Sequence, residues 1–160
     1  MDIALYEIIV VDNNSTDDSV EIIKRDFPVV VILNNEQNLG APRGRNVGSR
    51  RAFQKPVDYI LTLDNDLFIE KSCLKELLQF SEQGLTIGTI GAFIYDAANP
   101  QHLLSAGGVV DYTQNISRQL LKYSSQEHLI DVDYCGTGAM LTRRRIFNEL
   151  LGYIWRLRTA

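Results

Sequence analysis

Residues 59–68 constrain this chain more than any other stretch, because they join an apolar run to a pair of carboxylates. Tyr59–Leu63 is rich in β-forming side chains and follows Pro56, which predicts a buried strand. Asp64 and Asp66 come directly after it, and side chains two residues apart in an extended chain point to the same side. Two like charges side by side are costly unless a cation lies between them. The stretch therefore predicts a divalent-metal site, and an ordinary polar turn after a strand is the alternative that stays open here.

The residue types also limit which metal and ligand such a site would take. Magnesium and manganese prefer hard oxygen ligands, and magnesium usually takes one or two carboxylates together with phosphate oxygens and waters. A site built on Asp64 and Asp66 is therefore expected to hold Mg²⁺ or Mn²⁺ against a phosphorylated ligand.

Composition and charge exclude several classes of protein. The chain has 160 residues, of which 45% are hydrophobic and 22% charged, as in one folded domain. The net charge of −4 disfavours nucleic acid as the main partner. No apolar run is long enough for a transmembrane helix, and Asp2 and Glu7 interrupt the place of a signal peptide. We expect a cytoplasmic protein with reduced thiols at Cys73 and Cys135, and peripheral association with the cytoplasmic face of a membrane stays open.

Strand and helix patterns alternate over the first half of the chain. Strands are predicted over 6–11, 29–33 and 59–63, and helices over about 17–26, about 42–54 and around 74–78. This order predicts an α/β fold, namely a Rossmann-like, mostly parallel sheet with helices on both faces.

The pattern changes beyond residue 85. Strands predicted over 86–95, 104–112, 119–123 and 129–134 indicate a smaller mixed or antiparallel β region. A helix is predicted near 143–151, and its arginines at 143–145 are expected to form a solvated face.

Both polar clusters follow predicted strands. Asp12 and Asn13 end the first strand, as Asp64 and Asp66 end the third. Ligands of open α/β sheets bind outside the carboxyl ends of the strands, so the two clusters are expected to serve one site.

Four segments together resemble a known family, the family 2 glycosyltransferases. Residues 9–17 resemble its first nucleotide-binding loop, and residues 38–48 its N-x-G-x-x-x-A-R-N-x-G segment, with Gly44 where Ala is usual. Residues 63–66 resemble its D-x-D metal motif. Residues 135–144 resemble its G-x-x-M-L-x-R-R segment on the acceptor side. The four segments stand in the family's order and cover most of the chain.

The resemblance implies a GT-A fold and an inverting transferase with a nucleotide-diphosphate sugar donor and a divalent metal, Mn²⁺ or Mg²⁺. The implied donor-binding residues are Asp12, Asn13, Arg43, Arg45, Asp64 and Asn65. Arg43 or Arg45 would contact the diphosphate, where a guanidinium suits phosphate oxygens. Asp64 and Asp66 would hold the metal. Gly136, Thr137 and Gly138 would lie beside the acceptor, which is a glycan, a lipid-linked sugar or a polysaccharide.

Two departures from the family pattern shape the expectation about activity. The family usually has a strand and a helix before the segment at 9–17, and a later Glu-Asp pair that supplies the catalytic base. The resemblance therefore implies that residues 1–160 are a single but incomplete domain, with no base identified. A nucleotide-sugar-binding remnant without activity is the alternative reading. A haloacid-dehalogenase-like phosphatase also ends a strand in D-x-D, but here Leu67 and Phe68 stand where it needs a small residue and Thr.

Overall fold

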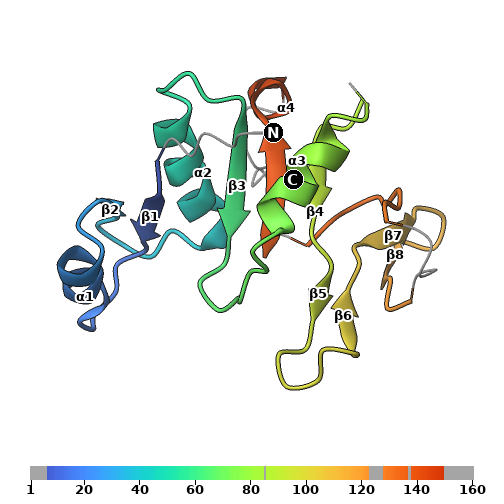
Figure 1. Cartoon of the computed structure of the whole chain (residues 1–160), viewed down its shortest axis with the longest axis horizontal. Helices are drawn as coiled ribbons and strands as arrows, with labels where there is room; N and C mark the ends of the chain where they lie inside the picture. The colour runs from blue at the N-terminus through green and yellow to red at the C-terminus, as the bar shows by residue number, and fades with distance from the viewer. Residues whose placement is uncertain (1–6, 85, 123–127, 137, 150–160) are drawn as a thin grey trace. The chain divides into compact units, whose positions relative to one another are not determined.

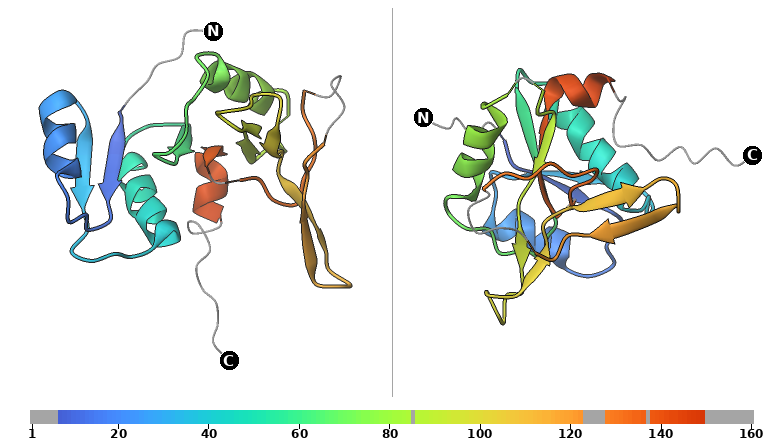
Figure 2. Two further views of the ribbon diagram at one scale, coloured as in Figure 1. Left: turned by 90° about the horizontal axis from the view of Figure 1, so that it is seen from below. Right: turned by 90° about the vertical axis from the view of Figure 1, so that its right-hand side faces the viewer.

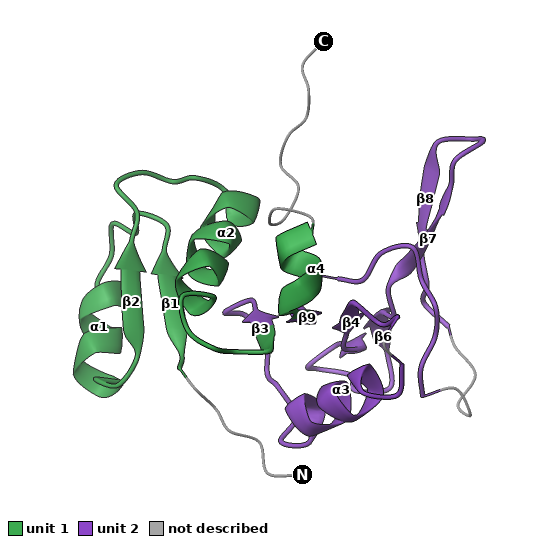
Figure 3. Cartoon of the chain, turned by 90° about the horizontal axis from the view of Figure 1, so that it is seen from above, with its two compact units in different colours: residues 1–60, 143–160 green, residues 61–142 purple. Residues whose placement is uncertain are grey.

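The computed structural model describes residues 7–84, 86–122, 128–136 and 138–149. The chain divides into two compact units, which are unit 1 (residues 1–60 and 143–160) and unit 2 (residues 61–142) (Figure 3). The described residues form four helices and nine strands in mixed order, which confirms a mixed α/β protein (Figure 1).

Unit 1 begins with a parallel strand pair. Strands β1 (Ile9–Asp12) and β2 (Val31–Asn34) pair in parallel, with Ile9 opposite Val31 and Asp12 opposite Asn34. Helix α1 (Ser19–Asp26) connects them, because parallel neighbours need a crossover (Figure 1). The parallel register brings the polar residues that follow both strands to one edge of the pair.

Helix α2 (Ala41–Ala52) follows in unit 1 and packs closely on β1. It begins after Gly40, whose φ of 75° favours glycine, and carries a proline in its first turn. Its buried positions hold small or polar residues, Gly44, Asn46 and Ser49. A helix face without large side chains lets the backbone approach the strand.

Unit 2 contains the main core of the described residues. Most residues of the sheet with the order β3-β9-β4 belong to this unit, and the strands are β3 (Tyr59–Leu63), β9 (Ala139–Arg143) and β4 (Thr89–Gly91). Strand β9 runs antiparallel to β4, and its residues 139–142 are all buried. Helix α3 (Cys73–Ser81) contributes Leu77 to this core.

Two antiparallel hairpins complete unit 2. Strand β5 (Ile94–Tyr95) pairs with β6 (Leu103–Ser105), and β7 (Gly108–Asp111) pairs with β8 (Ile116–Gln119) (Figure 2). The last helix, α4 (Arg144–Glu149), lies in unit 1. There its Phe147 ring lies 4.9 Å from the ring of Phe53.

The expectation of a mostly parallel sheet differs from the structure. Across the described parts of the chain, β1 and β2 form the one parallel pair, and the sheets of unit 2 contain antiparallel pairs. For the two hairpins the physical reason is connection length: β5 leads to β6, and β7 to β8, through short links, which antiparallel neighbours allow and parallel ones do not. The predicted antiparallel region after residue 85 is confirmed.

Individual elements also differ from the prediction. The predicted strand over 129–134 is reduced to a single bridge between Gly108 and Tyr134. The sequence analysis does not predict strand β9, because its residues lie within the segment 135–144 that was interpreted only as a family motif. Parts of the predicted elements at 6–11, 119–123 and 143–151 lie outside the described residues.

The expected solvated face of arginines is wrong for Arg144. Its guanidinium donates hydrogen bonds to the carbonyl oxygens of Phe53 (2.8 Å), Lys55 (2.7 Å) and Val57 (3.4 Å). It also lies 5.4 Å from the centre of the Phe53 ring. A planar fork of donors suits the three carbonyls of the segment that follows α2, so this arginine ties α4 to that segment within unit 1.

Candidate functional site

The first polar cluster lies in unit 1, where β1 ends. The two carboxylate oxygens of Asp12 each accept a hydrogen bond from the Ser15 backbone N–H, both at 3.2 Å. This turn folds the loop back toward α1, and an aspartate is suited to it because its side chain reaches backbone groups nearby. Asp12 is half-buried and Asn14, with φ of 70°, is exposed.

Asn13 braces this loop against the segment that leads into α2. Its Oδ1 accepts from the Leu39 N–H (3.0 Å) and the Asn35 amide (3.1 Å), and its Nδ2 donates to Asn38 Oδ1 (2.9 Å). Asn38 Oδ1 also accepts from the N–H of Gly40 at 2.9 Å. Three of the four hydrogen-bonding places of the Asn13 side chain are therefore used within the protein. The sequence predicted a donor contact for Asn13 and missed this bracing role.

The predicted diphosphate-binding arginines both lie on α2. Arg43 is exposed and Arg45 half-buried, and each already takes part in an interaction within the protein. The bracing by Asn13 fixes the start of the helix that carries them. Unit 1 thus brings Asp12, Asn13 and the start of α2 together.

The second polar cluster lies in unit 2, directly after β3. The Asp64 backbone N–H donates to the Gly138 carbonyl oxygen at 2.8 Å. A Cβ added at Gly138 would lie 3.0 Å from Leu67 Cδ1, 3.3 Å from Ile94 Cδ1 and 3.8 Å from Asp64 Oδ2. Glycine is therefore fitted between the carboxylate loop and β5. The D-x-D loop and the predicted acceptor-side segment meet at this point.

The other predicted residues of these segments differ in exposure. Asp64 is half-buried, whereas Asn65 and Asp66 are exposed. Gly136 is half-buried, and a Cβ there would make ordinary contacts with Ile94 Cδ1 (3.7 Å) and Ser105 Oγ (3.8 Å). Thr137 lies outside the described residues.

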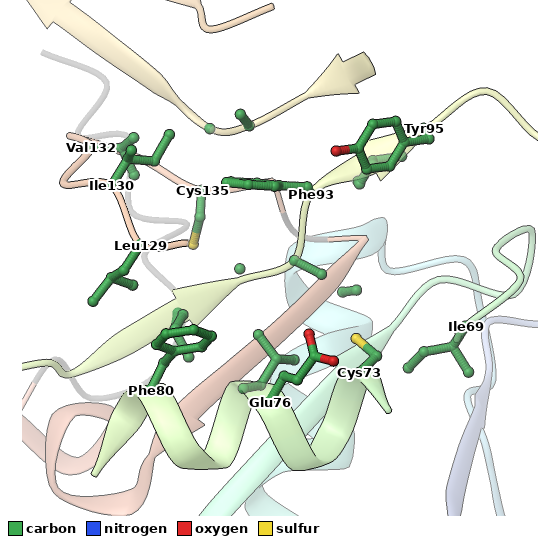
Figure 4. Close-up of a pocket in the computed structure, with 18 of the residues that line it drawn as sticks. Ile69, Cys73, Glu76, Phe80, Phe93, Tyr95, Leu129, Ile130, Val132 and Cys135 are labelled. Atoms are coloured by element: carbon green, nitrogen blue, oxygen red, sulfur yellow. The ribbon is translucent and has the colours of Figure 1, made fainter. Parts of the chain in front are cut away.

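A cavity of about 1470 Å³ lies within unit 2 next to this cluster, and Asp66 is among its lining residues. Figure 4 shows its walls, with Glu76 and Phe80 on α3 facing Phe93, Tyr95 and Cys135. Aromatic and aliphatic side chains form most of the lining. The sequence did not predict this cavity, because it is made by segments distant in the chain.

Two thiols face the cavity, and both have altered acidity. Burial raises the pKa of the Cys73 thiol, and the negative charges of Glu76 and Glu70 raise it further. Burial also raises the pKa of the Cys135 thiol. Both cysteines are free, as the sequence predicted, and both are half-buried.

The carboxylates of Asp64 and Asp66 are the candidate ligands for a metal ion. Within the described ranges, no group of three or more His, Cys, Asp or Glu side chains is placed to hold a metal ion. Asp64 and Asp66 are therefore a two-carboxylate set, which fits the way magnesium binds when phosphate oxygens and waters complete its shell.

These features define a class of protein: an α/β protein with polar loops after its strands and a carboxylate pair beside a cavity. The chain belongs to the family described as glycosyl transferase family 2, whose sequence profile matches residues 2–151.

Two curated relatives agree with this assignment. An uncharacterized glycosyltransferase of Haemophilus influenzae is 32% identical over 155 residues, covering 96% of this chain and 48% of that protein. A second from the same organism is 33% identical over 111 residues, covering 66% of this chain and 43% of that protein. The chain thus spans about half the length of the relatives it matches. Among the described residues, no helix is long and apolar enough to cross a membrane.

Proposed function

We propose that this family 2 glycosyltransferase binds a nucleotide-diphosphate sugar together with Mg²⁺ or Mn²⁺ and transfers the sugar, with inversion, to an acceptor hydroxyl. The observation that carries the proposal is the hydrogen bond between the Asp64 N–H and the Gly138 carbonyl. It joins the carboxylate loop to the segment that is predicted to lie beside the acceptor, next to a cavity large enough for a saccharide. The proposal includes the GT-A arrangement and a cytoplasmic site of action.

Residues of the first polar cluster, in unit 1, would contact the nucleotide part of the donor. Asp12 would accept hydrogen bonds from the base or ribose, and Asn13 would act by holding the loop that presents Asp12. Arg43 or Arg45 would contact the diphosphate, because a guanidinium matches phosphate oxygens. Asn65 is exposed next to the carboxylates and would add a polar contact to the donor.

Asp64 and Asp66 would hold the metal against the diphosphate. A bound divalent ion supplies Lewis-acid stabilisation of the charge that develops on the leaving phosphate. Asp64 is suited to this position because its backbone is fixed to Gly138 and its carboxylate is half-buried. Gly136 and Gly138 would lie beside the acceptor. The candidate classes of acceptor are a glycan, a lipid-linked sugar and a polysaccharide.

Turnover also needs a base that takes the proton of the acceptor hydroxyl. Asp131 and Asp133 line the cavity, but the Asp133 carboxylate already accepts a hydrogen bond from the Val110 N–H at 2.7 Å. The hydrogen bond uses only Oδ2 of Asp133, so both carboxylates stay to be tested as the base, and binding of the nucleotide sugar without transfer is the second candidate function.

Calorimetric titration of nucleoside diphosphates with and without Mn²⁺ tests the donor and metal assignment. We expect binding that needs the metal and that is weakened at least tenfold in Asp64→Asn and Asp66→Asn. Glu21→Gln, which removes a charge from the exposed face of α1, is the matched control and should bind as the parent does. Equal binding by parent and both aspartate variants would refute the metal site.

Product analysis then separates the two candidate functions. The protein is incubated with a panel of nucleotide sugars and saccharide acceptors, and released nucleotide and glycosylated product are both measured. Product formation supports the transferase. Metal-dependent binding with neither product nor nucleotide release supports binding alone.

A further inference from the structure

We propose that Asn38 is a positioning residue for the donor, one that fixes the start of helix α2 and thereby places the arginines that would contact the diphosphate. This inference rests on the proposed function, in which Arg43 or Arg45 makes that contact. Asn38 opens the family segment at residues 38–48, and the resemblance implied no role for it.

One oxygen of Asn38 serves two donors. Its Oδ1 accepts a hydrogen bond from Asn13 Nδ2 and another from the Gly40 backbone N–H, both at 2.9 Å. Asn13 belongs to the loop that follows β1, and Gly40 is the residue that immediately precedes α2. A single side-chain oxygen therefore connects the loop after β1 to the start of the helix.

The conformation of Gly40 decides where α2 begins. Gly40 has φ of 75°, and its carbonyl oxygen accepts the hydrogen bond that opens the helix, from the Gly44 N–H at 3.0 Å. Glycine has more backbone freedom than any other residue, and it has no side chain with which to cap a helix. The turn at Gly40 therefore depends on an acceptor for its N–H, and Asn38 Oδ1 supplies that acceptor.

Asp12, which would contact the base or ribose, is held independently of Asn38. Its carboxylate accepts the Ser15 N–H, and its carbonyl oxygen accepts the Asn35 N–H at 2.9 Å. Asn13 Oδ1 accepts two hydrogen bonds, at 3.0 Å and 3.1 Å, in which Asn38 takes no part. Loss of the Asn38 oxygen is therefore expected to release the start of α2 and to leave the Asp12 loop in place.

The two arginines depend on the start of α2 because both lie within its first two turns. A guanidinium matches phosphate oxygens through a planar fork of donors, so a displaced helix start would weaken the contact of Arg43 or Arg45 with the diphosphate. A nucleoside has no phosphate for these arginines to contact. The structure therefore predicts that Asn38 affects the binding of a nucleoside diphosphate and not that of the nucleoside alone.

Titration with phosphorylated and unphosphorylated probes tests this inference. The diphosphates of adenosine, guanosine, uridine and thymidine are titrated with Mg²⁺ into the isotope-labelled full chain, and the tightest is compared with its own nucleoside by NMR. In Asn38→Ala we expect the diphosphate to bind about tenfold more weakly, as for one lost hydrogen bond to a charged group, and the nucleoside to stay within about twofold of the parent. Gln37→Ala, which removes the neighbouring exposed side chain, is the matched control and should change neither affinity.

Two further variants separate positioning from a general loss of stability. Asn38→Asp keeps an oxygen that can accept from both donors, so diphosphate affinity should return to within about threefold of the parent at about 0.15 M salt, where charge repulsion is screened. Arg144→Lys should lower stability through the segment that follows α2 and leave the ratio of the two affinities at the parent value.

Three results would overturn the inference. One is an equal loss of nucleoside and diphosphate affinity in Asn38→Ala, which a merely structural role would produce. Another is diphosphate affinity in Asn38→Asp as low as in Asn38→Ala, which would indicate that the amide group itself contacts the donor. The third is a ratio of affinities that Arg144→Lys changes as much as Asn38→Ala does.

Hydrogen exchange of the Gly40 amide tests the contact with Asn38 without any donor. The exchange should be about fivefold faster in Asn38→Ala, because the amide loses its acceptor, and an unchanged rate would refute the contact. A parent protein that binds none of the four diphosphates would refute the proposed function and this inference with it. A parent that binds them, with the same ratio of affinities in Asn38→Ala, would refute this inference alone.

Discussion

Two glycines of helix α2 allow a sharp test of how unit 1 is packed. Gly44 and Gly48 are four residues apart and so lie on one face of the helix. A Cβ at Gly48 would lie 2.9 Å from Val11 Cγ2 on β1, which is too close without movement. A Cβ at Gly44 would meet the Asn13 side chain at 3.9 Å, an ordinary contact. The same substitution to alanine should therefore have opposite effects at the two positions.

The magnitudes follow from two opposing contributions. Alanine is favoured over glycine inside a helix by about 1 kcal/mol, and this gain is shared by both variants. Gly44→Ala should therefore raise the free energy of unfolding by about 0.5–1 kcal/mol. At Gly48 overpacking costs about 1–3 kcal/mol, and Val11 is stiff at χ1 because it is β-branched. We expect the free energy of unfolding of Gly48→Ala to be about 1–3 kcal/mol lower than that of Gly44→Ala.

Urea denaturation of the two variants and the parent measures this difference. A change of 1 kcal/mol also corresponds to about 2–4 °C in Tm for a protein of this size. The decisive comparison repeats both substitutions in a Val11→Ala background, which removes the methyl group that Gly48 would meet. There Gly48→Ala should become as stabilising as Gly44→Ala, and the coupling energy isolates the contact.

The packing of α2 on β1 would be refuted by either of two results. One is equal stability of Gly44→Ala and Gly48→Ala. The other is a Gly48→Ala penalty that stays the same after Val11 is shortened.

Three further predictions concern single side chains. Arg144→Lys should destabilise the protein by about 1–3 kcal/mol in urea denaturation, because an ammonium cannot reproduce the fork that donates to three carbonyls. Asn13→Asp should lower the free energy of unfolding by about 1–2 kcal/mol, since it replaces the amide donor with an acceptor facing another amide oxygen. Glu76→Gln should lower the raised pKa of Cys73 toward its ordinary value and speed its alkylation at pH 8, with Cys135 unchanged, as the pH dependence of the alkylation rate will show.

Each of these has a matched comparison. Arg145→Lys controls for Arg144, because its side chain is 60% exposed, and should change stability by less than about 0.5 kcal/mol. An Arg144→Lys protein as stable as this control would contradict the assigned hydrogen bonds. Asn14→Asp, at an exposed position beside Asn13, should be close to neutral. A Cys73 alkylation rate unaffected by Glu76→Gln would show that the charge of Glu76 does not contribute to the raised pKa.

The sequence determined those features that depend on neighbouring residues. An apolar run of β-forming residues set the bounds of strand β3, Tyr59–Leu63, and helical spacing placed α1, α2 and α3 within a few residues. Motif order likewise indicated the family that the sequence profile identifies. These are local properties, since a strand or helix pattern is written in residues a few positions apart.

Only the tertiary structure decided which distant segments meet. It placed β9 between β3 and β4, and so set the Gly138 carbonyl against the Asp64 N–H. It also engaged Asn13 in bracing a loop and Arg144 in capping carbonyls, where the sequence suggested a ligand contact and a solvated face. The physical reason is that strand pairing and hydrogen-bond satisfaction are chosen among many partners along the chain, and a residue type alone does not specify which partner it will have.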